Sequence, residues 1–312
     1  MRLSRRGLQL ALGVLWLLDG ALQLQPVMFT RQFARGIIEP AGSGQPALVH
    51  WLVTSAAAVI GARPVLFDAL FASVQLLLGI GLLWRRTSQG ALVASISWAL
   101  GVWIFGEGLG GVLGSGATLL NGAPGAAILY ALLGLAALDV DWRGRHLAVA
   151  SRFLAIAWAV IWTALAALAL ALGANAGGQI AASFRANASA LPGLLEVHAN
   201  ALAALLQHDG ALPGIALGLA CALIGLAGLW TDRWRVVAGV AGGSFALFTW
   251  VFAEALGGIG TGKATDPNSG PLLVLFAVAL SSQSLGARRQ LVATPLADSP
   301  VHEMSGSRSH AA

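Results

Sequence analysis

One stretch of this chain occurs twice, and this duplication constrains the fold more than any other feature. Residues 103–111 read WIFGEGLGG, and residues 250–258 read WVFAEALGG. The match continues without a gap to Pro124 and Pro271, at a constant separation of 147 residues, with ten identities in twenty-two positions. Self-similarity at one fixed separation is the signature of an internal repeat. We therefore expect two copies of one structural unit.

Each copy belongs to a series of long apolar segments. Hydrophobic residues make up 57% of the 312 residues and charged residues only 10%, whereas a soluble domain is about a quarter charged. The segments run for roughly 18–24 residues, the length of a helix that crosses about 30 Å of hydrocarbon. The alternating pattern of a membrane β-barrel is absent. The sequence therefore predicts an all-α integral membrane protein, with the lipid bilayer as a partner.

The apolar segments form two sets of four, which predicts eight transmembrane helices. Two shorter apolar segments, 47–61 and 191–207, are expected to be interfacial helices on the outer side, and the stretch 173–190 is expected to be a loop. The expected domains are a first four-helix repeat (1–140), a cytoplasmic linker (141–152), a second four-helix repeat (153–287) and a disordered cytoplasmic tail (288–312).

The N-terminal segment has two interpretations. Its basic start and apolar continuation fit a signal peptide. However, Trp16 aligns with Trp162 in the second copy, which favours a retained first helix.

The basic residues predict the orientation. With the N-terminus inside, thirteen of the eighteen Lys and Arg residues lie in inside connections, as the positive-inside rule requires. Both termini would then be cytoplasmic. Because each repeat has an even number of spans, the repeats would be parallel, related by an axis along the membrane normal. The net charge of +5 is explained by these connections, so we expect no nucleic-acid partner.

Glu107 and Glu254 are the first candidate ligand-binding residues. Each ends a third span just before a Gly-Gly pair, and ionisable residues at such places are functional candidates. The alternative is a surface carboxylate at the lipid headgroups. The glycines either turn the chain back to line a polar pocket or allow close helix packing.

His50 and His198 form a second repeated pair, 148 residues apart. Because both fall in the expected outer helices, each could pair with the glutamate of its own half. The alternative is two unrelated histidines at a wet interface. The E-x-x-H and H-x-x-x-H spacings of metal sites are missing, so we assign no metal. The sequence does not identify a cofactor.

Asp19 and Asp68 lie in spans of the first half only, so its pocket is expected to be the more polar one. The alternative for both is pairing with Arg31, Arg35 or Arg63. Asn121 and Asn268 complete the candidate set, although each also fits a turn that starts a fourth span. Asp266 and Lys263 occur in the second loop only.

One half resembles the DoxX-like family of bacterial four-helix membrane proteins, in the stretches LQLALGVLWLL (8–18) and QLLLGIGLL (75–83). The resemblance implies two fused copies in a bacterial inner membrane, beside a redox or quinone-linked system. It transfers no catalytic residue.

Three functions remain open from the sequence. The chain either binds a small ligand or ion in outward-facing polar pockets, with transport as one form of this, or is an accessory redox subunit that contacts a quinone, or is a structural or assembly factor for a membrane protein partner. Nothing in the sequence identifies an enzyme. Because the inner halves of the spans are nearly devoid of polar residues, a one-sided pocket is favoured over a channel.

Overall fold

The computed structural model describes residues 3–138, 146–230 and 232–293, and all regular structure in these ranges is helical. The first half contains α1 (Arg5–Gln23), α2 (Arg31–Phe33), α3 (Ala47–Ala62), α4 (Pro64–Leu83), α5 (Ser88–Phe105) and α6 (Ala126–Ala137). The second half contains α7 (His146–Ala171), α8 (Ala176–Ala186), α9 (Gly193–Leu206), α10 (Leu212–Ala227), α11 (Asp232–Phe252) and α12 (Ser269–Ala293). Short helical turns lie in the connections: η1 (Ala34–Ile38), η2 (Glu39–Gly42), η3 (Leu109–Gly111), η4 (Leu119–Asn121), η5 (Gly173–Asn175), η6 (Ala188–Ala190) and η7 (Ala255–Thr261).

The helices contact one another in the same order in both halves. In the first half α1 packs on α4, α4 on α5, α5 on α6, and α6 returns to α1. In the second half α7 packs on α10, α10 on α11, α11 on α12, and α12 returns to α7. The contacts of α6 with α12 and α7 join the two sets.

Small residues set the closest of these contacts. A Cβ atom added at Gly79 of α4 would lie 2.9 Å from the Gly13 carbonyl oxygen of α1, and one added at Gly218 of α10 would lie 3.2 Å from the Ala166 carbonyl oxygen of α7. Glycine therefore lets the two backbones approach in each pair, as in many membrane helix pairs.

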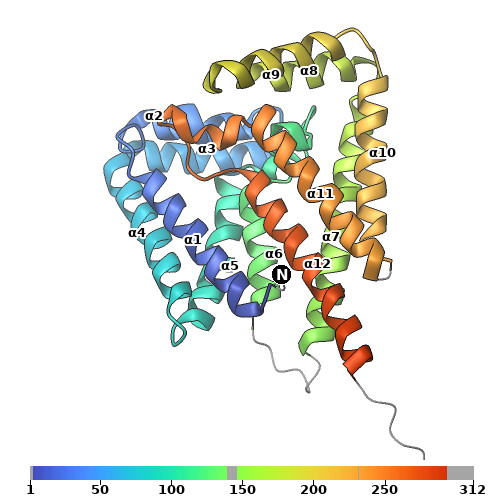
Figure 1. Cartoon of the computed structure of the whole chain (residues 1–312). Coiled ribbons are helices and arrows are strands. Elements are labelled where there is room, and N and C mark those ends of the chain that lie inside the picture. The colour runs from blue at the N-terminus through green and yellow to red at the C-terminus, as the bar shows by residue number, and fades with distance from the viewer. Residues whose placement is uncertain (1–2, 139–145, 231, 294–312) are drawn as a thin grey trace, which may run out of the picture.

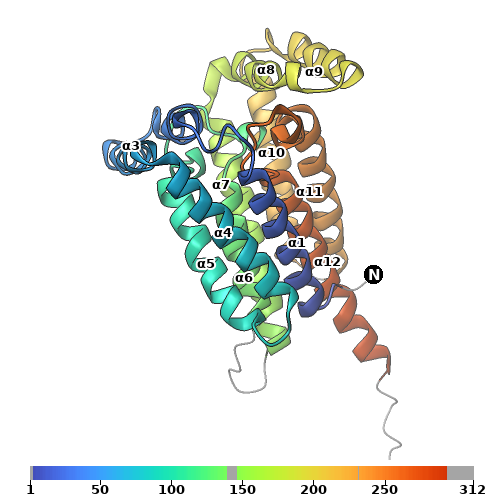
Figure 2. The same cartoon turned by 90° about the vertical axis from the view of Figure 1, so that its left-hand side faces the viewer.

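The axes of the long helices are roughly aligned, and the bundle that they form has two different ends (Figure 1 and Figure 2). The start of α1, the end of α6, the start of α7 and the end of α12 lie at one end of the bundle. Helix α3 lies across the opposite end, and α8 and α9 extend beyond it (Figure 1). The loops that follow α5 and α11 also lie at this second end.

Four helices are long and apolar enough to cross a membrane, namely Pro64–Leu83, Ser88–Phe105, Arg152–Ala171 and Arg233–Thr261. Large apolar side chains such as Leu77, Val93 and Val160 are more than half exposed on the outer faces of three of them. A soluble protein rarely leaves such surface in water. The fold therefore has the features of an integral membrane protein.

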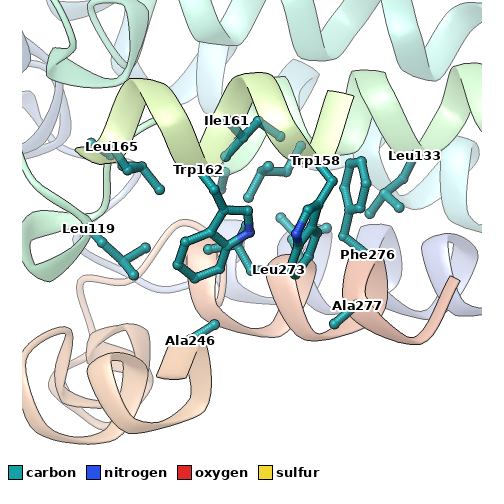
Figure 3. Packing of buried hydrophobic residues seen from close by; sticks show 14 of the residues in the cluster. Leu119, Leu133, Trp158, Ile161, Trp162, Leu165, Ala246, Leu273, Phe276 and Ala277 are labelled. Carbon is teal, nitrogen blue, oxygen red and sulfur yellow. The ribbon is translucent and has the colours of Figure 1, made fainter. Parts of the chain in front are cut away.

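Aromatic rings fill the interior of the second half (Figure 3). Trp158 and Trp162 of α7 are fully buried with ring centroids 5.3 Å apart, and Phe276 of α12 lies 5.8 Å from Trp158. The Trp158 indole donates a hydrogen bond to the Ile224 carbonyl of α10 at 3.0 Å. Together these side chains join three helices around one packed core.

The prediction of a loop at 173–190 is wrong, because α8 occupies most of it. Its glycines suggested a loop, but Ile180, Ala181 and Phe184 fall on one helix face and are buried. Helix also extends into the expected linker, from His146, and into the expected tail, to Ala293. The remaining parts of both predictions, 139–145 and 294–312, lie outside the described residues.

Candidate functional site

The glutamate motif forms the same unusual backbone turn in both halves. Four successive residues have positive φ angles, from 55° to 75° at 108–111 and from 48° to 69° at 255–258. Such left-handed conformations cost L-residues about 1–2 kcal/mol each, and glycine avoids that cost. The glycines of the motif therefore turn the chain.

A second role of these glycines is close approach to the following loop. A Cβ at Gly110 would lie 1.9 Å from the Pro124 carbonyl oxygen, and one at Gly257 would lie 2.5 Å from the Pro267 carbonyl oxygen. No side chain fits between backbones at these distances. Each turn is therefore held directly against the segment that starts the next helix.

Tryptophan hydrogen bonds confirm which prolines correspond. The Trp103 indole donates to the Pro124 carbonyl at 2.9 Å, and the Trp250 indole donates to the Pro267 carbonyl at 2.7 Å. These prolines are 143 residues apart, so the gap-free alignment of Pro124 with Pro271 is wrong beyond the Gly-Gly pair. The second loop is four residues shorter, which a comparison at constant separation cannot detect.

Each glutamate accepts a hydrogen bond from the start of the helix that follows. Glu107 Oε1 accepts from the Ala127 amide of α6 at 3.0 Å, and Glu254 Oε1 accepts from the Ser269 hydroxyl of α12 at 2.7 Å. In both residues Oε2 is buried without a hydrogen-bond partner among the described residues. A Cβ at Gly125 would lie 2.2 Å from Glu107 Oε2, so glycine there leaves room for the carboxyl group.

Glu107 lies at a cavity of about 570 Å³ that is formed mostly by the first half. The wall comes from α1, α3, α4, α5 and α6, together with the loop before α12. Most of it is aromatic or aliphatic, whereas Asp19, Glu107 and Asp266 bring three carboxyl groups to it. The volume lies in the usual range of small-molecule sites, about 300–1,000 Å³.

Asp19 and Tyr130 are among the most buried polar groups of this wall. Each is 2% exposed, and the Tyr130 hydroxyl interacts with the Asp19 carboxyl group. Neither this hydroxyl nor Asp19 Oδ1 has a further hydrogen-bond partner in the described part of the chain. Trp16, one turn before Asp19 on α1, stacks on the Tyr130 ring with centroids 4.3 Å apart. Buried polar atoms are normally paired, so these two groups are available to a ligand.

Asp266 reaches the cavity from the second half. Its Oδ1 accepts a hydrogen bond from the Asn268 amide at 2.7 Å, and its Oδ2 accepts one from the Thr265 hydroxyl at 2.8 Å. Both bonds are local to the loop and fix the carboxyl group. The corresponding residue of the first half, 143 positions earlier, is Ala123, so the charge is unique to one loop.

The loop carboxyl groups repel one another and are poorly solvated. Burial raises the pKa of Glu107 to about 8, and the negative charge of Asp266 contributes to this rise. Burial also raises the pKa of Asp266. Near neutral pH, Glu107 therefore holds a proton for most of the time.

Asp68 lies behind this wall. It is fully buried, and Oδ1 accepts a hydrogen bond from Gln23, which borders the cavity. Oδ2 has no partner among the described residues. Asp68 is thus bound to an amide, and no ion pair with Arg31, Arg35 or Arg63 is found in the described ranges.

The second half has apolar residues where the first has polar ones. Leu165 occupies the place of Asp19 when Trp162 is aligned with Trp16, and Leu273 occupies the place of Tyr130 at the separation of 143. Both leucines are buried, next to the packed rings of α7 (Figure 3). The helices therefore supply polar residues to the cavity from the first half only, whereas the second half contributes Thr265 and Asp266 from its loop.

The structure does not bring every candidate to the cavity. His50 Nδ1 lies 3.0 Å from the Gly42 carbonyl oxygen, and His198 Nδ1 lies 2.7 Å from the Leu194 carbonyl oxygen on the exposed face of α9. Neither histidine borders the cavity. The expected pairing of each histidine with the glutamate of its own half is thus not among the hydrogen bonds of the described residues.

The asparagines make local turns, and neither they nor Glu254 borders the cavity. Asn121 Oδ1 accepts from the Thr118 amide at 2.7 Å, and Asn268 Oδ1 accepts from the Ser269 amide at 2.8 Å.

Sequence reasoning missed Tyr130, Gln23 and the part played by Asp266. Tyr130 is the single tyrosine of the chain and lies inside an apolar segment, which is a signal that could have identified it. Asp266 was visible only as a difference between the two loops.

Among the described residues, no group of three or more His, Cys, Asp or Glu side chains is arranged to hold a metal ion. Comparisons with protein-family models, with curated proteins and with solved structures find no match to this chain.

Proposed function

We propose that this protein is a membrane-embedded binding protein for a small amphipathic molecule, which it holds in the cavity of the first half. The observation that carries the proposal is a largely apolar cavity of about 570 Å³ whose wall contains the buried, interacting pair Asp19 and Tyr130. Two carboxyl oxygens at this wall, Asp19 Oδ1 and Glu107 Oε2, have no hydrogen-bond partner among the described residues. Desolvated groups of this kind are costly unless a ligand satisfies them. A molecule with an apolar body and one polar end fits such a wall.

The membrane arrangement is part of the same proposal. We propose eight spans in two parallel repeats, with both termini on the cytoplasmic side of a bacterial inner membrane. The matching helix contacts of the two halves support the repeats, and the basic residues support the orientation. The cavity then lies near the outer surface, below α3.

A second candidate ligand is a quinone, which the resemblance to DoxX-like proteins suggests. The observation in its favour is a hydrogen-bond donor at the cavity, the Trp98 indole, which has no partner in the described ranges. The Tyr130 hydroxyl, which interacts with Asp19, is a second polar group of the same wall. The third function, a structural or assembly factor, would leave the cavity without a ligand.

Filling the cavity tests the proposal. Gly101 borders the cavity, and an added Cβ there would meet no atom within 4 Å. We expect Gly101→Phe to exclude the ligand without a clash at the backbone. Gly90→Phe is the matched control, because Gly90 lies on the same helix, is exposed, and is equally open.

The measurement is native mass spectrometry of the three proteins, followed by extraction and identification of bound organic molecules. We expect a bound species in the wild type and Gly90→Phe that Gly101→Phe lacks. Recovery of the same molecules from all three proteins, or of none from any, contradicts the proposal.

A further inference from the structure

The carboxyl groups of the cavity are not balanced by positive charge. Asp19 comes from α1, Glu107 follows α5, and Asp266 belongs to the loop before α12. The charges of Glu107 and Asp266 nevertheless act on Asp19, and the charge of Asp266 acts on Glu107. In the described residues, no Lys, Arg or His forms an ion pair with them. A buried cluster of this kind must either keep its protons or hold a cation.

The rest of the wall is suited to an organic cation. Trp16, Phe71 and Trp98 border the cavity, and the Phe71 and Trp98 rings form an edge-to-face pair with centroids 5.5 Å apart. Aromatic faces attract cations, most strongly where water is excluded. An anion would meet three acidic groups, and a bare metal ion would lack a compact set of ligands.

We infer that the ligand is a hydrophobic organic monocation, held by the carboxyl groups of Asp19, Glu107 and Asp266 and by the aromatic wall. This inference rests on the proposed function, because it names the ligand class of the same cavity. One positive charge is expected because each ionised carboxyl group makes ionisation of the next one more costly.

Binding of such a cation requires loss of a proton from the acidic group. The proton leaves a carboxylic acid for solvent, and the resulting carboxylate pairs with the cation. Affinity should therefore rise as pH rises toward about 8, the pKa of Glu107. The charge of Asp266 acts on Glu107, and the charge of Glu107 acts in turn on Asp19 and Tyr130.

The remaining titratable groups nearby are turned elsewhere. Asp68 on α4 is held by Gln23, His50 on α3 is turned to the Gly42 carbonyl, and Glu39 on η2 is exposed. None of them supplies a counter-charge to the cavity.

The test uses two probes of the same shape and opposite charge. Tetraphenylphosphonium is a cation and tetraphenylborate is an anion, and both are titrated by calorimetry into the full-length protein in phosphatidylcholine nanodiscs, with empty nanodiscs as the blank. We expect saturable binding of the cation only. Titrations in buffers of different ionisation enthalpy should show release of a proton on binding.

Three variants remove one charge each and keep the shape of the side chain. We expect Asp19→Asn and Glu107→Gln to weaken binding of the cation about tenfold or more. Asp266→Asn should also weaken it, although its Oδ1 can still accept the Asn268 amide and hold the loop. Glu39→Gln is the control that should retain wild-type affinity, because Glu39 is exposed and does not border the cavity.

Equal binding of the two probes, or wild-type affinity in both Asp19→Asn and Glu107→Gln, overturns the inference. Binding of decylubiquinone, a neutral quinone, shows whether only this inference fails or the proposed function fails as well. If the quinone binds the wild type but not Gly101→Phe, and the cation does not bind, then the cavity takes a neutral ligand and only the inference fails. If no probe binds and nothing co-purifies, both fail.

Discussion

Glu107→Gln should remove a large part of the pH dependence of stability. Folding raises the pKa of this carboxyl group from 4.5 to about 8, chiefly by burial. The folded protein therefore binds the proton more strongly than the unfolded chain does. The stabilisation is complete below about pH 4.5 and is lost as the pH rises to about 8.

The change in the free energy of unfolding follows from the difference between the two pKa values of Glu107. At about 1.4 kcal/mol per pH unit, the full difference between 4.5 and about 8 is roughly 5 kcal/mol, which is an upper limit. The stem of Glu107 borders the cavity and is partly exposed, although Oε2 is buried. Water in the cavity would reduce the penalty, so we expect a loss of about 2–4 kcal/mol.

The measurement is thermal unfolding in a non-ionic detergent between pH 5 and pH 8, followed by the fluorescence of the eleven tryptophans. The wild type should become less stable as the pH rises, and Glu107→Gln should lose much less stability over the same range. Glu39→Gln is the control, because Glu39 is exposed. A variant with the wild-type slope, or a wild type that gains stability toward pH 8, refutes the reasoning.

Three further predictions concern the turns and the topology. Gly110→Ala should destabilise the protein by several kcal/mol in thermal unfolding, because its Cβ would lie 1.9 Å from the Pro124 carbonyl oxygen, and an unchanged melting temperature would contradict this contact. Ala255→Gly should stabilise it by about 1 kcal/mol, since Ala255 has a φ of 48°, and a loss of stability would show that the methyl group matters more than the backbone strain. The orientation is tested by cysteine labelling in a variant whose native cysteine is replaced by serine. A cysteine placed at the exposed residue Ser43 should be labelled only from outside, and one placed at the exposed residue Thr87 only from the cytoplasm. The reverse pattern would contradict the orientation.

The sequence was most informative about the helices. Long apolar segments indicate helices wherever the hydrocarbon length is reached. The apolar segments 65–84 and 91–107 lie within three residues of the observed bounds of α4 and α5, and the segment 153–172 lies almost wholly within α7. The α8 helix was missed because its apolar face is short, at Ile180 and Phe184, and its first turn contains two glycines. A short amphipathic helix of this kind depends on tertiary packing more than on local preference.

The site was only partly visible in the sequence. Repetition drew attention to Glu107 and Glu254 equally, yet only Glu107 borders the cavity. The residues that distinguish the two halves are single differences, such as Asp19 against Leu165 and Asp266 against Ala123. The sequence shows where the two copies differ, but it does not show which of the differing residues lie at the same cavity. That depends on contacts between the halves, which only the structure shows.

The position of Asp266 makes the two halves dependent on each other. A loop of the second half completes a wall that the first half builds, so a molecule bound there contacts both halves and resists their separation. By mass action, a ligand at a hundred times its dissociation constant adds about 2.7 kcal/mol to the cohesion of the state that binds it. If the two halves were produced as separate polypeptides, the cavity would behave as a subunit interface, and the ligand would act as their assembly factor.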